Sequence, residues 1–162
     1  SLCVENIVVS VPKGVKGCKA CLKLCVGGGV YDVGVEVCDV VSPFGIDRAF
    51  GKHYMKLTSH APEEVAKFLD IEMRVKELVA PLVLSPCVSR FHSACTVSTM
   101  LDREIVITDA DGKQVSLFAI GRNTKMAMVR MKLGDVYELH GGKSATYKWI
   151  VSHMVLASSE TV

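Results

Sequence analysis

The first third of the chain contains two segments in which apolar and polar residues alternate with the two-residue period of a β-strand. In segment 19–26 the even-numbered residues are apolar, and the odd-numbered ones are two lysines and two cysteines. In segment 31–38 the odd-numbered residues are one tyrosine and three valines. Because the Gly27-Gly28-Gly29 triplet separates the two segments, the pattern predicts a β-hairpin whose first strand has a cationic outer face.

Beyond residue 61 the apolar residues recur with the period of an α-helix. They stand at positions 65, 68, 69, 75, 78 and 79, which share one helical face. Pro62 suits the first turn, and Glu63 and Glu64 suit the positive end of the helix dipole. Since Pro81 disfavours helix before it, the pattern predicts one helix of about 18 residues.

The last third of the chain returns to the strand period. Segments 103–108 and 113–120 flank an Asp109-Ala110-Asp111-Gly112 turn, and segments 135–140 and 145–156 follow. Strands joined by short glycine turns and interrupted by one helix predict a mainly β (α+β) fold with a closed or sandwiched antiparallel sheet. No internal repeat divides the chain, so we expect residues 1–162 to form a single domain.

The stretch from Glu104 to Leu156 contains an Asp-Gly hairpin, a linker, the sequence Lys132-Leu133-Gly134-Asp135-Val136-Tyr137-Glu138-Leu139 and a last strand. It resembles the later strands of OB-fold single-stranded DNA-binding domains such as those of replication protein A, in which a similar Gly-Asp-Val-Tyr segment starts a barrel strand. The resemblance implies a five-stranded OB-type antiparallel barrel with an inserted helix.

The middle of the chain carries a second motif. The stretch from Val35 to Phe44 leads into Ser42-Pro43-Phe44-Gly45-Ile46, and Tyr54-Met55-Lys56-Leu57 and the predicted helix follow. This order is similar to the Pro-Phe-Gly corner, strand and helix of single-stranded DNA-binding proteins from phages and large DNA viruses. The two resemblances imply a protein that supports replication, recombination or repair by binding single-stranded DNA.

The composition agrees with a globular protein. With 49% apolar and 22% charged residues, low-complexity disorder is excluded. The longest apolar stretches, such as 78–84, are far shorter than the roughly 20 residues of a membrane-spanning helix, so we expect no membrane partner and no secretory signal. Seven cysteines, an odd number, favour reduced thiols in the cytoplasm or nucleus.

The net charge of +2 is small, but the cations form two clusters. One lies between residues 13 and 23, and the other extends from Lys113 to Lys132 without an acidic residue. Single-strand binding needs cations for phosphates and aromatic faces for bases. Phe118 should be exposed if Val115 and Leu117 face the core, whereas Trp149 and Phe44 also suit the core. The candidate nucleic-acid-binding residues are Lys16, Lys19, Lys23, Tyr31, Tyr54, Lys113, Phe118, Arg122, Lys125, Arg130, Lys132, Tyr147 and Trp149.

Other chemistries find less support in the sequence. Cysteines at 18, 21, 25, 87 and 95, with His92, suggest a zinc site, but a strand over 19–26 places Cys18 and Cys21 on opposite faces. We therefore expect no metal and no other cofactor. The five histidines accompany no nucleophile elbow, so we expect that the protein is not an enzyme.

Two alternatives to single-stranded DNA remain open at this point. An RNA-binding viral protein would look the same, because no feature addresses the 2′-hydroxyl group. A self-assembling structural or interaction domain of the capsid or movement type is the other alternative. Met126, Met128 and Met131 would then form an adaptable contact surface for a homo-oligomer.

Overall fold

The computed structural model describes residues 4–10, 18–59, 61–82, 91–92, 96–139 and 144–158. Its elements in chain order are η1 (Val4–Asn6), β1 (Ile7–Ser10), β2 (Cys18–Val26), β3 (Gly29–Asp32), β4 (Gly34–Ser42), β5 (Ile46–Ala49), β6 (Lys52–Thr58), α1 (Pro62–Val79), β7 (Phe91–His92), β8 (Thr96–Thr108), η2 (Leu117–Ala119), β9 (Thr124–Leu133), β10 (Val136–Leu139), β11 (Ser144–Thr146) and β12 (Trp149–Leu156). The predicted mainly β fold with one α-helix is therefore confirmed. No helix in the described ranges is long and apolar enough to cross a membrane.

Five of the strands pair in a closed ring. Strand β4 pairs with β6 and β9, strand β12 pairs with β9 and β8, and β8 pairs with β6. In chain order these strands are β4, β6, β8, β9 and β12, which form the five-stranded barrel expected of an OB fold. The pairs are antiparallel as predicted, except that β8 and β12 run parallel.

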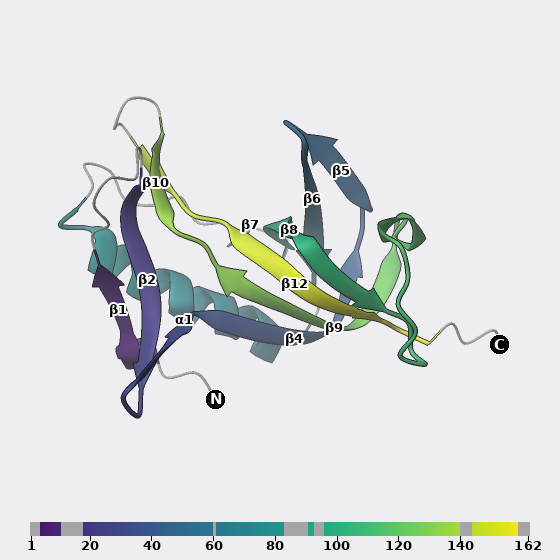
Figure 1. Cartoon of the computed structure of the whole chain (residues 1–162), viewed down its shortest axis with the longest axis horizontal. Coiled ribbons are helices and arrows are strands. Elements are labelled where there is room, and N and C mark those ends of the chain that lie inside the picture. Colours follow the sequence, from purple (N-terminus) through teal and green to yellow (C-terminus); the bar gives the residue numbers. More distant parts are fainter. Residues whose placement is uncertain are drawn as a thin grey trace.

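Helix α1 covers one end of the barrel and lies behind the barrel strands in Figure 1. It spans Pro62–Val79, as its apolar period predicts, and it buries Phe68, Ile71, Val75 and Val79. The ring of Phe68 meets that of Trp149 edge to face, with ring centroids 5.2 Å apart. The helix therefore completes the hydrophobic core from outside the ring.

A second sheet extends from the barrel. Its order is β1–β2–β10–β11, with β3 paired to β2. Strands β10 and β11 form a hairpin between barrel strands β9 and β12, and β3 continues into β4 through the fully buried Val33. The single strand predicted over 31–38 is thus divided between two sheets, because the chain passes from one to the other at Val33.

The strand predicted over 113–120 is wrong. Gln114 forms an isolated bridge with Thr108, and the chain then turns into η2. The Ser116 hydroxyl accepts a hydrogen bond from the Phe118 amide at 3.2 Å, and such local side-chain bonding competes with a strand ladder. The turn at Asp109–Gly112 forms as predicted, with the Gly112 amide donating to the Asp109 carbonyl.

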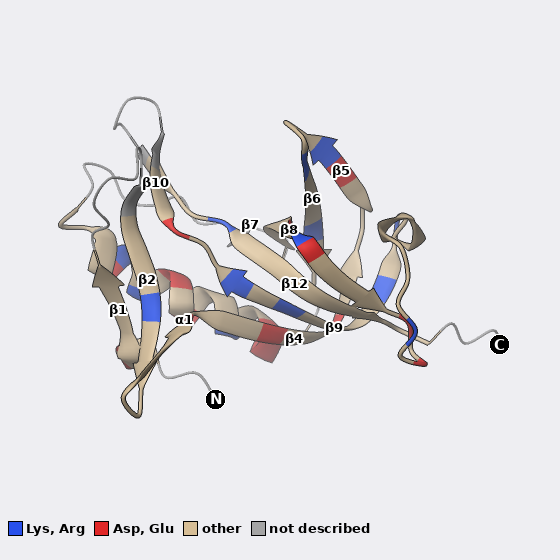
Figure 2. Cartoon of the chain, viewed as in Figure 1, with Lys and Arg blue, Asp and Glu red and all other residues tan. Residues whose placement is uncertain are grey.

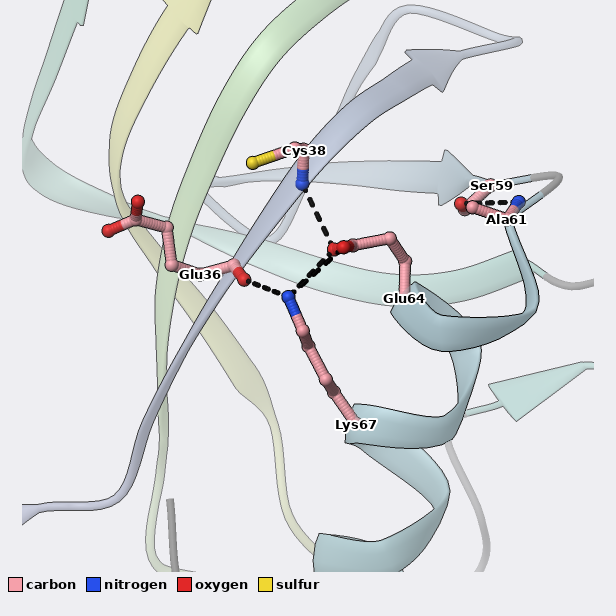
Figure 3. A network of polar contacts seen from close by, with 6 residues as sticks. All are labelled: Glu36, Cys38, Ser59, Ala61, Glu64 and Lys67. Atoms are coloured by element: carbon pink, nitrogen blue, oxygen red, sulfur yellow. Dashed lines mark hydrogen bonds and ion pairs between the residues drawn. The ribbon is translucent and has the colours of Figure 1, made fainter. Parts of the chain in front are cut away.

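The edge of β4 that faces away from β9 is covered by side chains of α1 (Figure 3). The Glu64 carboxylate accepts a hydrogen bond from the Cys38 amide at 3.1 Å, and the Lys67 ammonium donates to the Glu36 carbonyl at 3.0 Å. Lys67 also donates to both oxygens of Glu64 at 3.1 Å. The two helix side chains therefore occupy backbone groups that an additional strand would use.

Candidate nucleic-acid interface

A groove lies on the outer face of the barrel between the β5–β6 hairpin and the β10–β11 hairpin. Two cavities of about 580 and 590 Å³ form it, and Lys52, Met100, Lys132 and Ile150 line both of them. In Figure 1, β10 and the β5–β6 hairpin extend upward on either side of β12. We refer to the two cavities together as the groove.

The register of the barrel strands explains the floor of the groove. Lys132 of β9 pairs with Ile150 of β12, Ile150 pairs with Met100 of β8, and Met100 pairs with Tyr54 of β6. Residues paired directly across a sheet project from the same face. Their neighbours along the strands, such as Val151, are buried inside the barrel, so this row faces outward.

Cations outnumber carboxylates along the groove. The lining cations are Lys23, Lys52, Arg103, Lys132 and Lys148, and the lining carboxylates are Asp32, Asp102 and Asp135. Figure 2 shows blue segments on β2, β6 and β9, the strands that border it. The groove therefore has the positive balance that a polyanion requires.

Two ion pairs reduce this positive charge. The Lys23 ammonium lies 2.6 Å from the Asp32 carboxylate, and that of Lys132 lies 4.0 Å from the Asp102 carboxylate. The hydrogen bond from Lys23 lowers the pKa of Asp32, and the same bond raises the pKa of Lys23. Both members of the Lys23–Asp32 pair keep their charge at neutral pH, so Asp32 partly neutralises one end of the groove.

Aromatic and apolar side chains also line the groove or lie beside it. The Lys148 ammonium lies 5.4 Å from the centroid of the Tyr54 ring, and Tyr137 lines the opposite part of the groove with 41% of its surface exposed. At the tip of the β5–β6 hairpin, Phe50 is 98% exposed beside Gly51, which lines the groove. Ile105 and Leu117 add apolar wall.

The structure brings four of the predicted site residues together, one of which, Tyr147, is buried in the groove wall. Lys23 and Lys132 line the groove, and Tyr54 belongs to the outward row beside it. Lys52 and Tyr137 also line the groove and were not among the predicted residues, although the alternation of Lys52, Tyr54 and Lys56 on one strand face was a usable signal. Lys148, Arg103 and Phe50 were not predicted either. Lys148 and Phe50 lie in connections between strands, and Arg103 lies within β8.

Other predicted residues lie outside the groove. Phe118 is 96% exposed, as expected, but it lies on η2 instead of a strand. Arg130 pairs with Glu36 at 3.1 Å on the outside of the barrel, and Tyr31 is exposed on β3. Three exposed cations of the β8–β9 connection and the start of β9 are also outside the groove: Lys113, Arg122 and Lys125.

Several predictions fall beyond what the structure describes. Lys16 lies outside the described residues, and of Lys19 only the backbone in β2 is described. Cys87 and Cys95, two candidates for the zinc site, also lie outside them.

Tyr147 and Trp149, two of the candidate binding residues, are both buried, which for Trp149 is the core position that the sequence also suited. Trp149 is 0% exposed because it faces the barrel interior against Phe68, and its indole Nε1 donates to a Glu72 carboxylate oxygen at 3.5 Å. Tyr147 contributes to the groove wall but is only 1% exposed. Neither ring has a free face for a base. Phe44 is instead 61% exposed.

No model of a known protein family matches the sequence, and a comparison with curated proteins finds no match. The fold is similar to that of gp2.5, a single-stranded DNA-binding protein encoded by bacteriophage T7, with a TM-score of 0.51, 13% identity, and coverage of 81% of this chain and 89% of that one. It is also similar to the single-stranded DNA-binding protein from bacteriophage Enc34, with a TM-score of 0.54, 8% identity, and coverage of 94% and 91%. For a C-terminal truncation of the Enc34 protein the TM-score is 0.56, with 9% identity and coverage of 94% and 96%. The predicted likeness to phage proteins of the OB type is confirmed at the level of the fold.

Proposed function

We propose that the protein binds single-stranded DNA in the groove, with little sequence preference and without catalysing a reaction. One observation carries the proposal: a cation-rich, apolar-floored groove lies on the binding face of an OB barrel. In OB folds the face of the second and third strands, with the loops after the first and fourth strands, binds oligonucleotides. In this chain those parts are β6, β8, the β5–β6 hairpin and the β10–β11 hairpin.

The residues divide between phosphates and bases. Lys52, Lys132 and Lys148 supply charge for phosphates, and Tyr54 and Tyr137 supply rings on which bases stack. The floor of Met100 and Ile150 offers apolar contact to any base. A binding mode made of charge and stacking tolerates sequence, as single strands exposed in replication, recombination or repair require.

The self-assembly alternative loses its main support. Met126 and Met131 are each 1% exposed and belong to the core, so they offer no contact surface. Met128 is half-buried. RNA remains an outcome of the binding experiment, since phosphate contacts and base stacking are available to RNA as well as to DNA.

A titration of a fluorescently labelled oligothymidylate of about 16 nucleotides tests the proposal. The test variant combines Lys52→Gln, Lys132→Gln and Lys148→Gln. The matched control removes three cations outside the groove: Lys76→Gln, Lys113→Gln and Lys125→Gln. Affinity is measured at several salt concentrations between roughly 50 and 200 mM, with an oligouridylate and a DNA duplex as competitors.

Affinity falls with salt, and the plot of log affinity against log salt should be less steep by about 2 in the groove variant, since each of the three lost phosphate contacts to a single strand contributes about 0.7 to the steepness. The control should retain the wild-type slope. If the groove variant and the control lose affinity equally, binding is not specific to the groove. Absence of binding at low salt would refute the proposal as a whole. A stronger affinity for the oligouridylate would assign the groove to RNA.

A further inference from the structure

The outward face of β6 continues past the groove. Lys52, Tyr54 and Lys56 alternate on this face, and residues two apart in an antiparallel strand are separated by about 6.8 Å. Lys52 lines the groove, and the ring of Tyr54 lies under the Lys148 ammonium. One step further, the Lys56 ammonium lies 5.9 Å from the centroid of the Phe44 ring. Cation and aromatic groups therefore recur together along one strand, inside and outside the groove.

The corner before β5 holds Phe44 next to Lys56. Ile46 pairs with Met55, so Gly45 stands opposite Lys56 in the continuation of that register. Gly45 has φ 70°, and a Cβ atom there would lie 3.2 Å from the carbonyl carbon of Gly121, so the corner packs directly on the β8–β9 connection. The Ser42 hydroxyl donates to the Gly45 carbonyl at 3.2 Å. The backbone beneath Phe44 is therefore closely packed and locally hydrogen-bonded.

Phe44 nevertheless leaves 61% of its surface exposed, and Arg122 of the β8–β9 connection is exposed as well. The amide nitrogen of Arg122 would lie 3.4 Å from a Cβ atom on Gly45, so its backbone is adjacent to the corner. An exposed ring on a packed corner, with the Lys56 ammonium near it and an exposed arginine on the adjacent backbone, has the composition of a single-strand contact: an aromatic face for a base and charges for phosphates.

We propose that Phe44, Lys56 and Arg122, here named the corner patch, form a further nucleotide subsite that extends the groove along β6. The inference rests on the proposed function, and it adds the direction in which the single strand leaves the groove, which is along β6. A base stacks on Phe44, and the adjoining phosphates contact Lys56 and Arg122. Asp47 pairs with Tyr54 across β5 and β6 and is exposed, so its carboxylate faces the same path and opposes the phosphate charge.

Oligonucleotide length separates the corner patch from the groove. Wild type, Phe44→Ala and Lys56→Gln are titrated with oligothymidylates of about 4 and about 16 nucleotides, the limits of OB site sizes. Phe118→Ala is the control, because it removes another exposed phenylalanine, which lies on η2 and not at the corner before β5. Thermal unfolding of each variant is measured in parallel.

Phe44→Ala should weaken binding of the long oligomer about fivefold or more, from the loss of one stacked base, and leave the short oligomer unaffected. Lys56→Gln should lower the salt slope by about 0.7 for the long oligomer only. Asp47→Asn should strengthen long-oligomer binding. Phe118→Ala should change neither affinity.

Three results would overturn the corner patch while leaving the groove intact. The first is an unchanged long-oligomer affinity in both Phe44→Ala and Lys56→Gln. The second is an equal loss for short and long oligomers. The third is a loss of self-association in Phe44→Ala without a loss of binding, which would assign the patch to contacts between protein chains. If the wild type binds neither oligomer, the proposed function fails together with this extension.

Discussion

Replacing Trp149 by alanine would remove the largest fully buried side chain of the barrel. Deleting a buried tryptophan costs about 3–5 kcal/mol, of which the edge-to-face contact with Phe68 accounts for about 0.5–1.5 kcal/mol. For a chain of this size each kcal/mol shifts the midpoint of thermal unfolding by about 2–4 °C. We therefore expect the midpoint to fall by about 6–20 °C. Trp149→Phe keeps one ring in the core and should cost less than half of this.

The same variants distinguish a core residue from a base platform. A stacking role would give about 1–3 kcal/mol weaker binding and an unchanged unfolding midpoint. A core role gives the reverse for Trp149→Phe: a lower midpoint and a wild-type affinity for oligothymidylate at temperatures where the protein is folded. Circular dichroism follows unfolding, and fluorescence anisotropy of a labelled oligomer follows binding. A tenfold loss of affinity without a change in midpoint would refute our placement of Trp149.

Four further predictions concern the groove and the barrel edge. The single variant Lys52→Gln should lower the salt slope for oligothymidylate by about 0.7, measured against a Lys76→Gln control. Asp32→Asn should strengthen binding, because it frees Lys23 from its ion pair. In the wild type, the hydrogen bond from Lys23 lowers the pKa of Asp32 below its ordinary 3.8, so the small stabilisation by this exposed pair is present above pH 3.8 and is lost as the pH falls through the lowered pKa. Carboxyl NMR titration should show this midpoint return toward 3.8 in Lys23→Gln. Glu64→Ala should accelerate hydrogen exchange at the Cys38 amide and lower the free energy of unfolding by about 0.5–1.5 kcal/mol, and unchanged exchange would contradict the bond.

Local patterns predicted most of the secondary structure. The apolar period from Pro62 located the helix, and the alternation in 19–26 located β2. The resemblance of the Gly134-Asp135 segment to OB domains pointed to the barrel, but the implied place of that segment in a barrel strand is wrong, because it leads into β10 of the second sheet. The split of 31–38 at Val33 was not predictable, because alternation continues through it and only tertiary packing decides which sheet each half joins.

The groove could be predicted only in part. Lys52 and Lys132 are far apart in sequence. They line one groove because the pairing of β6, β8, β12 and β9 places Tyr54 in one row with Lys132, and Lys52 lies two residues from Tyr54 on the same strand face. Such register depends on the closure of the barrel, which no short motif records. Exposure of Phe118 was predicted from strand alternation, yet the ring is exposed on a short 3-10 turn. A core position was one of the two roles expected of Trp149, whereas strand alternation gave no indication that Tyr147 would be buried as well.

The contact between α1 and β4 protects the protein from aggregation. Glu64 and Lys67 bond to the free edge of β4, while Phe68 on the same helix covers the core. If α1 detaches, an unpaired strand edge and an apolar barrel end become accessible in a single step. These are the two features that promote aggregation of β proteins. The tendency to aggregate in storage should therefore follow the local free energy of helix detachment, and helix-stabilising substitutions on the solvent side of α1 should extend shelf life more than equal gains elsewhere.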